Sequence, residues 1–337
     1  MNNEDTDFGS FPGFDPGGFT SFAQIQREVE QFSKILTALG IDIQPGSPLE
    51  NMCLTLLGLE EQRKNAELIN PMEDIRVFMR PALGLHDLLR RVVRLHKRPD
   101  FLQLLPHLRL LNASTVAQNV AAPRDAVAAK IFELLMGLVC MEVGHDIELD
   151  GPVESYGDNP DILVTLDSRR WGFACKVLYG TSAITLFDRL QDGVRQIERS
   201  PAEIGCTIIN LKNQINHEET WPTANRDEYE QGRETPTFGA WKSLDYPRDI
   251  LLELASLRHE ELVSVNGEPA IQSLINGTKS IPGALLFLQT ATALASPIGP
   301  INSTIGIFSL IRLGDIPPST GAVLDRLNDA MHHRRPA

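Results

Sequence analysis

The order of sequence patterns between residues 123 and 212 is the feature that most limits the fold. A long apolar helical pattern, "PRDAVAAKIFELLMGLVCMEVG", is followed by a short alternating strand pattern, "HDIELD". The stretch "NPDILVTLDSRRWGFACKV" predicts two strands around a polar turn, and an amphipathic helix and a buried strand, "GCTIINLK", follow it. This α-β-β-β-α-β order predicts an α/β fold, with a mixed sheet flanked by helices.

The rest of the chain divides into three parts. Residues 1–20 are rich in Gly, Pro and Phe without periodicity, which predicts a disordered tail. Residues 21–115 carry helical patterns broken by prolines and predict a helical N-terminal region. Residues 116–337 are predicted to be one domain, whose polar insertion at residues 213–249 either faces a substrate or is mobile.

Residues 281–311 contain no charged side chain, which raises the question of a membrane span. A break at "SPIGPINST" leaves neither half as an unbroken apolar run of the length that a span needs. We therefore expect two buried strands here and no membrane partner. A helix over residues 246–263 and a final helix over residues 322–332 complete the predicted elements.

Charge and cysteine usage limit the partners and the compartment. The 337 residues carry a net charge of −13, so the chain as a whole repels a polyanion, and contact with DNA requires a local basic patch. The N-terminus has no basic segment followed by an apolar run, so no secretory signal is expected.

The four cysteines lie far apart in apolar runs, which predicts buried thiols and a cytoplasmic location: Cys53, Cys140, Cys175 and Cys206.

A basic stretch at residues 76–112 reverses this overall charge. It holds eight arginine and lysine residues against two aspartates. Helical spacing predicts a phosphate-contacting face with DNA as partner, or else a solvated helix face that pairs with acids elsewhere. The candidate residues of this face are Arg90, Arg94, Lys97 and Arg98.

The hairpin at residues 159–177 is predicted to have two different faces. A turn at "DSRR", or at its two central residues, sets Asp161 opposite Lys176 and Leu163 opposite Ala174. Because strand side chains alternate, Asp161, Ala174 and Lys176 share one face, while the other face is wholly apolar. We expect the core to lie on the apolar side alone.

Glu133 is a carboxylate within the apolar helical pattern "AAKIFELLMGLVCM", where an ionised group needs a cationic partner. With Ala126, Lys130 and Gly137 it forms a stripe of small or polar residues on one side of the helix. This stripe is predicted to lie over the polar face of the hairpin. A salt bridge to Lys130 or to an arginine is the alternative role for Glu133.

Together these residues resemble the core of the PD-(D/E)XK nucleases, the restriction-endonuclease-like superfamily. The matching positions are Glu133, Pro160-Asp161 and the "ACK" of Ala174, Cys175 and Lys176, within residues 123–212. The resemblance implies phosphodiester hydrolysis with Mg²⁺, or Mn²⁺ in its place. Asp161, an acid at position 174, the Cys175 carbonyl and Glu133 would hold the metal, and Lys176 would position the attacking water.

Ala174 departs from the family pattern, because alanine cannot bind a metal. We consider three explanations: an introduced inactivating substitution, a degenerate nuclease kept for binding, or an acid supplied instead by Asp188 or Glu198. Gln191 and Gln196 lie where family members often have a polar helper residue, and they are equally compatible with solvent-facing positions.

The resulting expectation is a cytoplasmic metal-dependent DNA endonuclease. A role in defence against foreign DNA is suggested by the resemblance to this family and not by particular residues. This chain would be inactive because of Ala174. The alternative is a non-catalytic subunit that binds nucleic acid or protein. A protein partner or a homodimer is compatible with either. Motifs for nucleotide phosphates (GxxxxGK[ST]), serine hydrolases (GxSxG) and zinc proteases (HExxH) are absent from the sequence.

Overall fold

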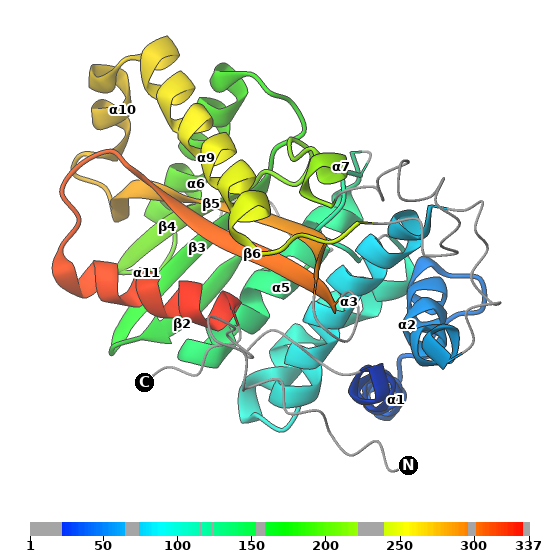
Figure 1. The fold of residues 1–337 in the computed structure, drawn as a ribbon. Coiled ribbons are helices and arrows are strands. Elements are labelled where there is room, and N and C mark those ends of the chain that lie inside the picture. Colours follow the sequence, from blue (N-terminus) through cyan, green and yellow to red (C-terminus); the bar gives the residue numbers. More distant parts are fainter. Residues whose placement is uncertain are drawn as a thin grey trace.

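The computed structural model describes residues 22–64, 74–114, 116–122, 124–152, 159–221, 239–295 and 301–332. Within these ranges a six-stranded mixed sheet is flanked by helices on both faces, which confirms the predicted α/β fold (Figure 1). The predicted tail at residues 1–20 lies outside the described residues, as do residues 222–238 of the predicted insertion.

The sheet has the strand order β1-β2-β3-β4-β5-β6. Strands β1 to β3 are antiparallel, β3, β4 and β5 are parallel, and β5 and β6 form a long antiparallel hairpin. The strands are β1 (His145–Leu149), β2 (Ile162–Leu166), β3 (Arg169–Val177), β4 (Ile204–Asn210), β5 (Ser280–Leu294) and β6 (Ile301–Arg312).

The helices agree with the predicted series, and α5 to β4 follow the expected α-β-β-β-α-β order. Helix α10 and the short α7 are additional elements. The helices are α1 (Phe22–Ala38), α2 (Pro48–Lys64), α3 (Ile75–Leu95), η4 (Pro99–Leu104), α4 (Leu105–Leu108), η5 (Arg109–Asn112), α5 (Ala126–Val143), α6 (Ala183–Arg199), α7 (His217–Thr220), α9 (Asp245–Asn266), α10 (Glu268–Ile275) and α11 (Pro318–Met331).

Both faces of the hairpin β2-β3 are covered, so the expectation of a core on one side alone is wrong. Helix α5 packs on the apolar face, and it also reaches β5, where Phe132 contacts Phe287 with ring centroids 5.2 Å apart. Helix α6 packs on the opposite face, the face of Ala174. A Cβ at Gly193 of α6 would lie 2.3 Å from Thr207 Oγ1, so this close approach requires glycine. The predicted placement of α5 over the polar face is therefore also wrong.

The turn between β2 and β3 corrects the predicted register. Its central residues are Asp167 and Ser168, with φ angles of 47° and 62°, and Leu166 pairs with Arg169. Positive φ at both central positions is the pattern of a tight hairpin turn that favours Asn-Gly. The observed pairing is displaced by two residues from the predicted one. Because side chains alternate with period two, this displacement leaves every side chain on its predicted face.

Replacing Ser168 with glycine is expected to stabilise the fold by about 1 kcal/mol, because glycine removes the cost of a left-handed conformation for an L-residue. Urea unfolding at equilibrium measures the change. The matched control is Ser182→Gly, at an exposed serine before α6 whose φ is −70° and whose side chain makes no capping hydrogen bond. This control should be neutral or slightly destabilising. A loss of stability in Ser168→Gly would contradict the turn geometry.

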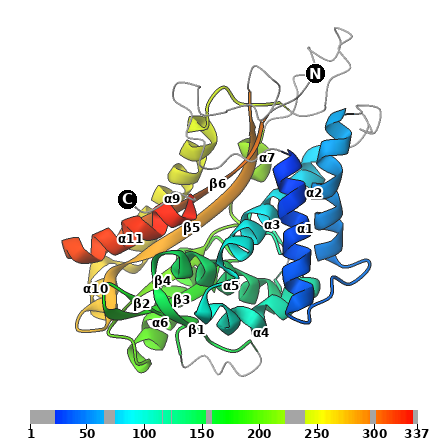
Figure 2. The same ribbon diagram turned by 90° about the horizontal axis from the view of Figure 1, so that it is seen from below.

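The helical N-terminal region packs directly on the sheet through α3, which lies between the sheet and α1–α2 (Figure 2). Arg91 of α3 is fully buried and donates hydrogen bonds to the carbonyl oxygens of Ala330 and Met331 at the end of α11, at 2.9 and 2.8 Å. It also pairs with Glu142 of α5 at 2.7 Å. One continuous core therefore joins the N-terminal helices, α5, the sheet and α11.

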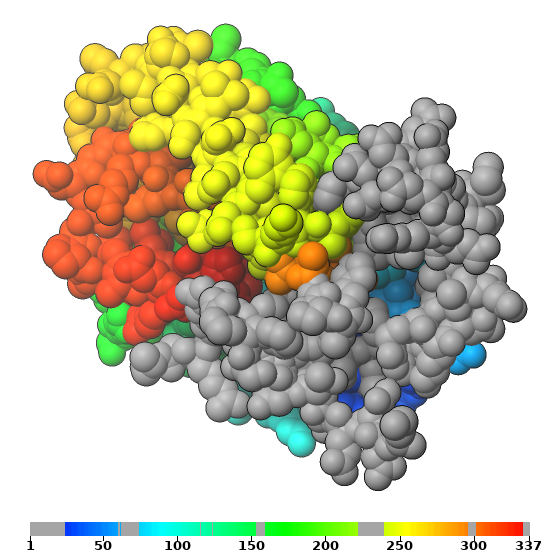
Figure 3. All heavy atoms as spheres, viewed as in Figure 1, coloured from blue at the N-terminus to red at the C-terminus, as the bar shows by residue number. Residues whose placement is uncertain are grey.

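The uncharged late segment forms β5 and β6, as predicted. Among the described residues, no helix has the length and apolar character that crossing a bilayer requires. All four cysteines are buried and free, which confirms their prediction as thiols. Helices α9 and α10, in yellow, and α11, in red, form much of the coloured face in Figure 3.

Candidate functional site

The structure brings three of the predicted site residues together from three elements. Asp161 directly precedes β2, Lys176 lies near the end of β3, and Glu133 lies in the second turn of α5. Lys176 Nζ is 3.4 Å from Asp161 Oδ2. Glu133 and Asp161 are only 4% and 5% exposed, and the charge of Asp161 acts on the Glu133 carboxyl.

Asp161 is held by both the backbone and the side chains of β3. Its Oδ2 accepts a hydrogen bond from the Cys175 N–H at 2.6 Å as well as the contact from Lys176. In a strand the N–H and C=O of one residue face the same neighbour, so the Cys175 carbonyl also faces this side. The Cys175 thiol is buried, and burial raises its pKa well above the usual value, so it stays protonated.

Glu133 is bound by the predicted partner Lys130 and by a histidine that the sequence did not indicate. Its Oε2 is 2.9 Å from Lys130 Nζ and 3.3 Å from His107 Nε2. Burial, followed by the charge of Asp161, raises the pKa of Glu133, and the lysines oppose this. Burial lowers the pKa of His107 to about 4, so the imidazole is neutral. His107 comes from α4 in the N-terminal region, where the apolar "LLPHLRLL" gives no sign of a site residue.

Ala174 is fully buried and lies beside Thr207 of β4, facing α6. Neither proposed substitute acid reaches the cluster. Asp188 is exposed on α6, and Glu198 accepts a hydrogen bond from the N–H of Lys279, directly before β5, at 2.9 Å. The explanation by a relocated acid is therefore wrong for these two residues.

The two glutamines of α6 differ in role. Gln191 is exposed, as expected for a solvent-facing position. Gln196 is 9% exposed and its Oε1 accepts a hydrogen bond from Lys176 Nζ, so the solvent-facing alternative is wrong for this residue. Lys176 is thus held between Asp161 and Gln196.

The oxygen donors present do not fit a magnesium site as they stand. Mg²⁺ needs hard oxygen ligands in near-octahedral geometry. Within the described ranges, no three His, Cys, Asp or Glu side chains are grouped as metal ligands. Position 174 supplies no oxygen, and Asp161 Oδ2 and Glu133 Oε2 each already accept two contacts.

Most side chains of the predicted phosphate-contacting face form ion pairs or hydrogen bonds within the protein. Arg98 pairs with Asp100 at 3.0 Å and donates to the Gly144 carbonyl at 2.8 Å. Arg90 lies 3.8 Å from Glu28, and Arg94 pairs with Glu142. Lys97 is exposed. The positive charge that remains toward solvent comes chiefly from Arg94 and Lys97.

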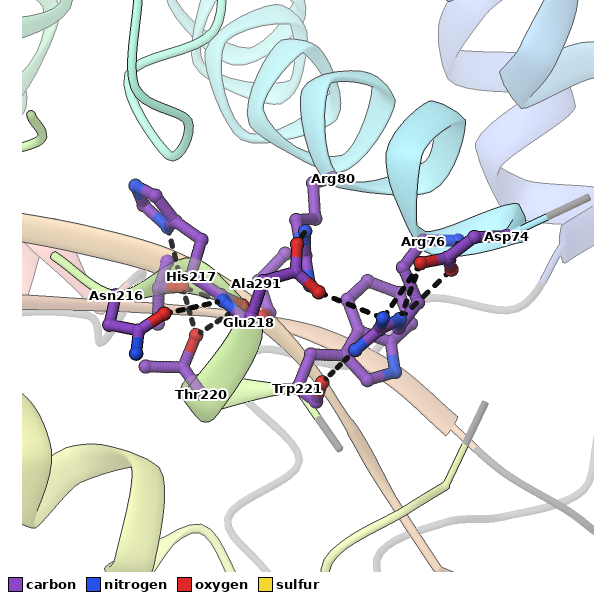
Figure 4. Close-up of polar contacts among 10 residues, drawn as sticks. Asp74, Arg76, Arg80, Asn216, His217, Glu218, Thr220, Trp221 and Ala291 are labelled. Carbon is purple, nitrogen blue, oxygen red and sulfur yellow. Dashed lines mark hydrogen bonds and ion pairs between the residues drawn. The ribbon is translucent and has the colours of Figure 1, made fainter. Parts of the chain in front are cut away.

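A second polar cluster fixes the first part of the predicted insertion (Figure 4). Glu218 of α7 pairs with Arg76 of α3 at 2.8 Å and also with Arg80. On the other side of α7, the side chains of His217 and Thr220 hydrogen-bond Thr290 of β5 at 3.1 and 2.7 Å. Helix α7 is therefore anchored to both α3 and the sheet.

Comparisons with protein-family models, with curated proteins and with solved structures found no match to this chain.

Proposed function

We propose that this chain has a nuclease-type site of the PD-(D/E)XK kind, from which one metal-binding carboxylate is missing. The observation that carries the proposal is the convergence of Glu133, Asp161 and Lys176, the three residues that the sequence pattern selects. The order of elements around them, from α5 to β4, agrees with the same pattern. The substrate we propose is DNA, and the setting is cytoplasmic defence.

In this proposal the chain does not itself hydrolyse phosphodiesters. Lys176 retains a position next to Asp161 from which an ammonium can neutralise a phosphate oxygen. The Ala174 side chain offers neither a base nor a ligand. Restoring a carboxylate at this position tests the proposal: purified Ala174→Glu protein should cleave plasmid DNA in the presence of Mg²⁺.

A non-catalytic binding subunit is the second candidate, and the pairing of each buried carboxylate with its own lysine supports it. Two carboxylates, Glu133 and Asp161, face two ammonium groups, Lys130 and Lys176, in a region that is almost fully buried. A folded Ala174→Glu protein that cleaves neither single-stranded DNA, duplex DNA nor RNA would leave this candidate as the better account.

Reversing the charge of Arg94 and Lys97 tests whether the C-terminal end of α3 and the residues just after it contact DNA. If they do, the double variant Arg94→Glu/Lys97→Glu should bind DNA more than tenfold more weakly, and the slope of log affinity against log salt should fall by about two. Glu142 keeps its partner Arg91, so the fold should be retained. The matched control reverses two exposed residues elsewhere, Lys242 and Arg248. Equal effects of both pairs would refute a contact at α3.

A further inference from the structure

The arrangement of charges around Glu133 and Asp161 has a feature that the family pattern does not contain. Each buried carboxylate has its own lysine: Lys130 lies 2.9 Å from Glu133, and Lys176 lies 3.4 Å from Asp161. Lys130 precedes Glu133 by three residues on α5, so the helix itself holds the two side chains on one side. Both lysine side chains are mostly buried, at 16% and 13% exposure.

These contacts occupy one oxygen of each carboxylate. Glu133 Oε2 receives Lys130 Nζ and His107 Nε2, and Asp161 Oδ2 receives Lys176 Nζ and the Cys175 N–H. Two contacts use both lone pairs of one carboxylate oxygen, and the other oxygen of each carboxylate still has its own lone pairs. A divalent cation that bound the remaining oxygens would lie at close range to two ammonium groups, whose positive charge repels it.

We infer that Lys130 and Lys176 are tethered counter-ions that take the electrostatic place of a divalent cation, so that this chain binds neither Mg²⁺ nor Mn²⁺ at Glu133 and Asp161. Lys176 belongs to the nuclease pattern, whereas Lys130 is an additional cation that pairs with Glu133. The inference concerns the same site as the proposed function, but it does not require that any form of the chain cleaves nucleic acid.

Binding of Mn²⁺ alone, followed by electron paramagnetic resonance, tests the inference. The unaltered chain should bind no Mn²⁺ up to about 1 mM, and neither EDTA nor Mg²⁺ should change its melting temperature. Lys130→Met should create a Mn²⁺ site at least about tenfold tighter than that limit. Adding Asp161→Asn to Lys130→Met should abolish this site and so locate it.

Two further variants keep the result decisive. Lys130→Gln removes the charge but retains an N–H donor for Glu133, so it answers the question if Lys130→Met does not fold. Arg189→Met removes the cation of an exposed pair with Asp192 at the same spacing on α6, and it should create no site. Mn²⁺ binding by the unaltered chain, or no binding by either folded Lys130 variant, would overturn the inference.

Discussion

Ala174→Glu protein is expected to cleave plasmid DNA in Mg²⁺ at a rate at least about 100-fold above that of the Ala174 chain. The reason is geometric. Ala174 follows Phe173, which pairs with Ile162, so continuing the register places position 174 opposite Asp161. A carboxylate at this position would add its charge beside that of Asp161, next to Lys176, and would supply the missing oxygen donor. Linearisation and nicking of supercoiled plasmid measure the rate.

The matched control is Ala174→Gln, which adds nearly the same volume without the charge. Ala174 is fully buried, so both variants should lose about 1 to 3 kcal/mol of stability from overpacking, and thermal unfolding checks that each is folded. Cleavage by Ala174→Glu should disappear when Lys176→Ala is added. Equal cleavage by the glutamate and glutamine variants would point to a contaminating nuclease and would count against the proposed function.

Much of the fold could be predicted because the signals are local. The alternation of Ile162 and Val164 with Leu163 and Thr165 fixes which side chains share a face, and a register displacement of two residues leaves this result unchanged. The long uncharged segment was predicted as two strands because its Pro/Gly break rules out an unbroken apolar run.

The features that could not be predicted depend on contacts between distant segments. His107 becomes part of the cluster only because α4 packs on α5. Gln196 lies within an amphipathic helix, and its burial follows from the packing of α6 on the Ala174 face of β3 and β4.

The centre of the turn between β2 and β3 was not predicted for a local reason. Asp167 and Ser168 adopt left-handed conformations without glycine, so composition alone does not distinguish them from their neighbours.

Ion pairs with acidic residues also explain why the sequence could not decide whether the basic stretch around α3 contacts phosphates or pairs with acids of the protein. Besides nearby aspartates, it pairs with three glutamates from α1, α5 and α7, which are far away in the chain: Glu28, Glu142 and Glu218. The net positive charge of residues 76–112 is therefore larger than the positive charge that these residues present to solvent in the folded protein.

Lys212 provides the clearest opportunity to stabilise this protein. It follows β4 and is fully buried, and its Nζ contacts the Ala117 carbonyl at 3.4 Å. In the part of the chain that the structure describes, Asp125 is the one carboxylate whose charge acts on the Lys212 ammonium group. Burial, opposed only by the charge of Asp125, lowers the pKa of Lys212 from 10.5 to about 8. The folded state therefore disfavours the ammonium form.

The sign of the pH dependence follows from proton binding. Between about pH 8 and 10.5 the unfolded chain holds more protons at Lys212 than the folded protein, so the stability contributed by this residue rises with pH. At pH 7 both states are protonated, and the full cost, about 3 kcal/mol, is present.

Lys212→Met should therefore raise the free energy of unfolding at pH 7 by about 2 to 3 kcal/mol, after allowing for the lost contact to Ala117. The advantage over the unaltered chain should shrink as pH rises from 8 and vanish above 10.5. Urea unfolding at a series of pH values measures both effects. Lys97→Met, at an exposed lysine, should show neither. A constant difference across this pH range would mean that Lys212→Met gains its stability from packing and not from loss of a buried charge.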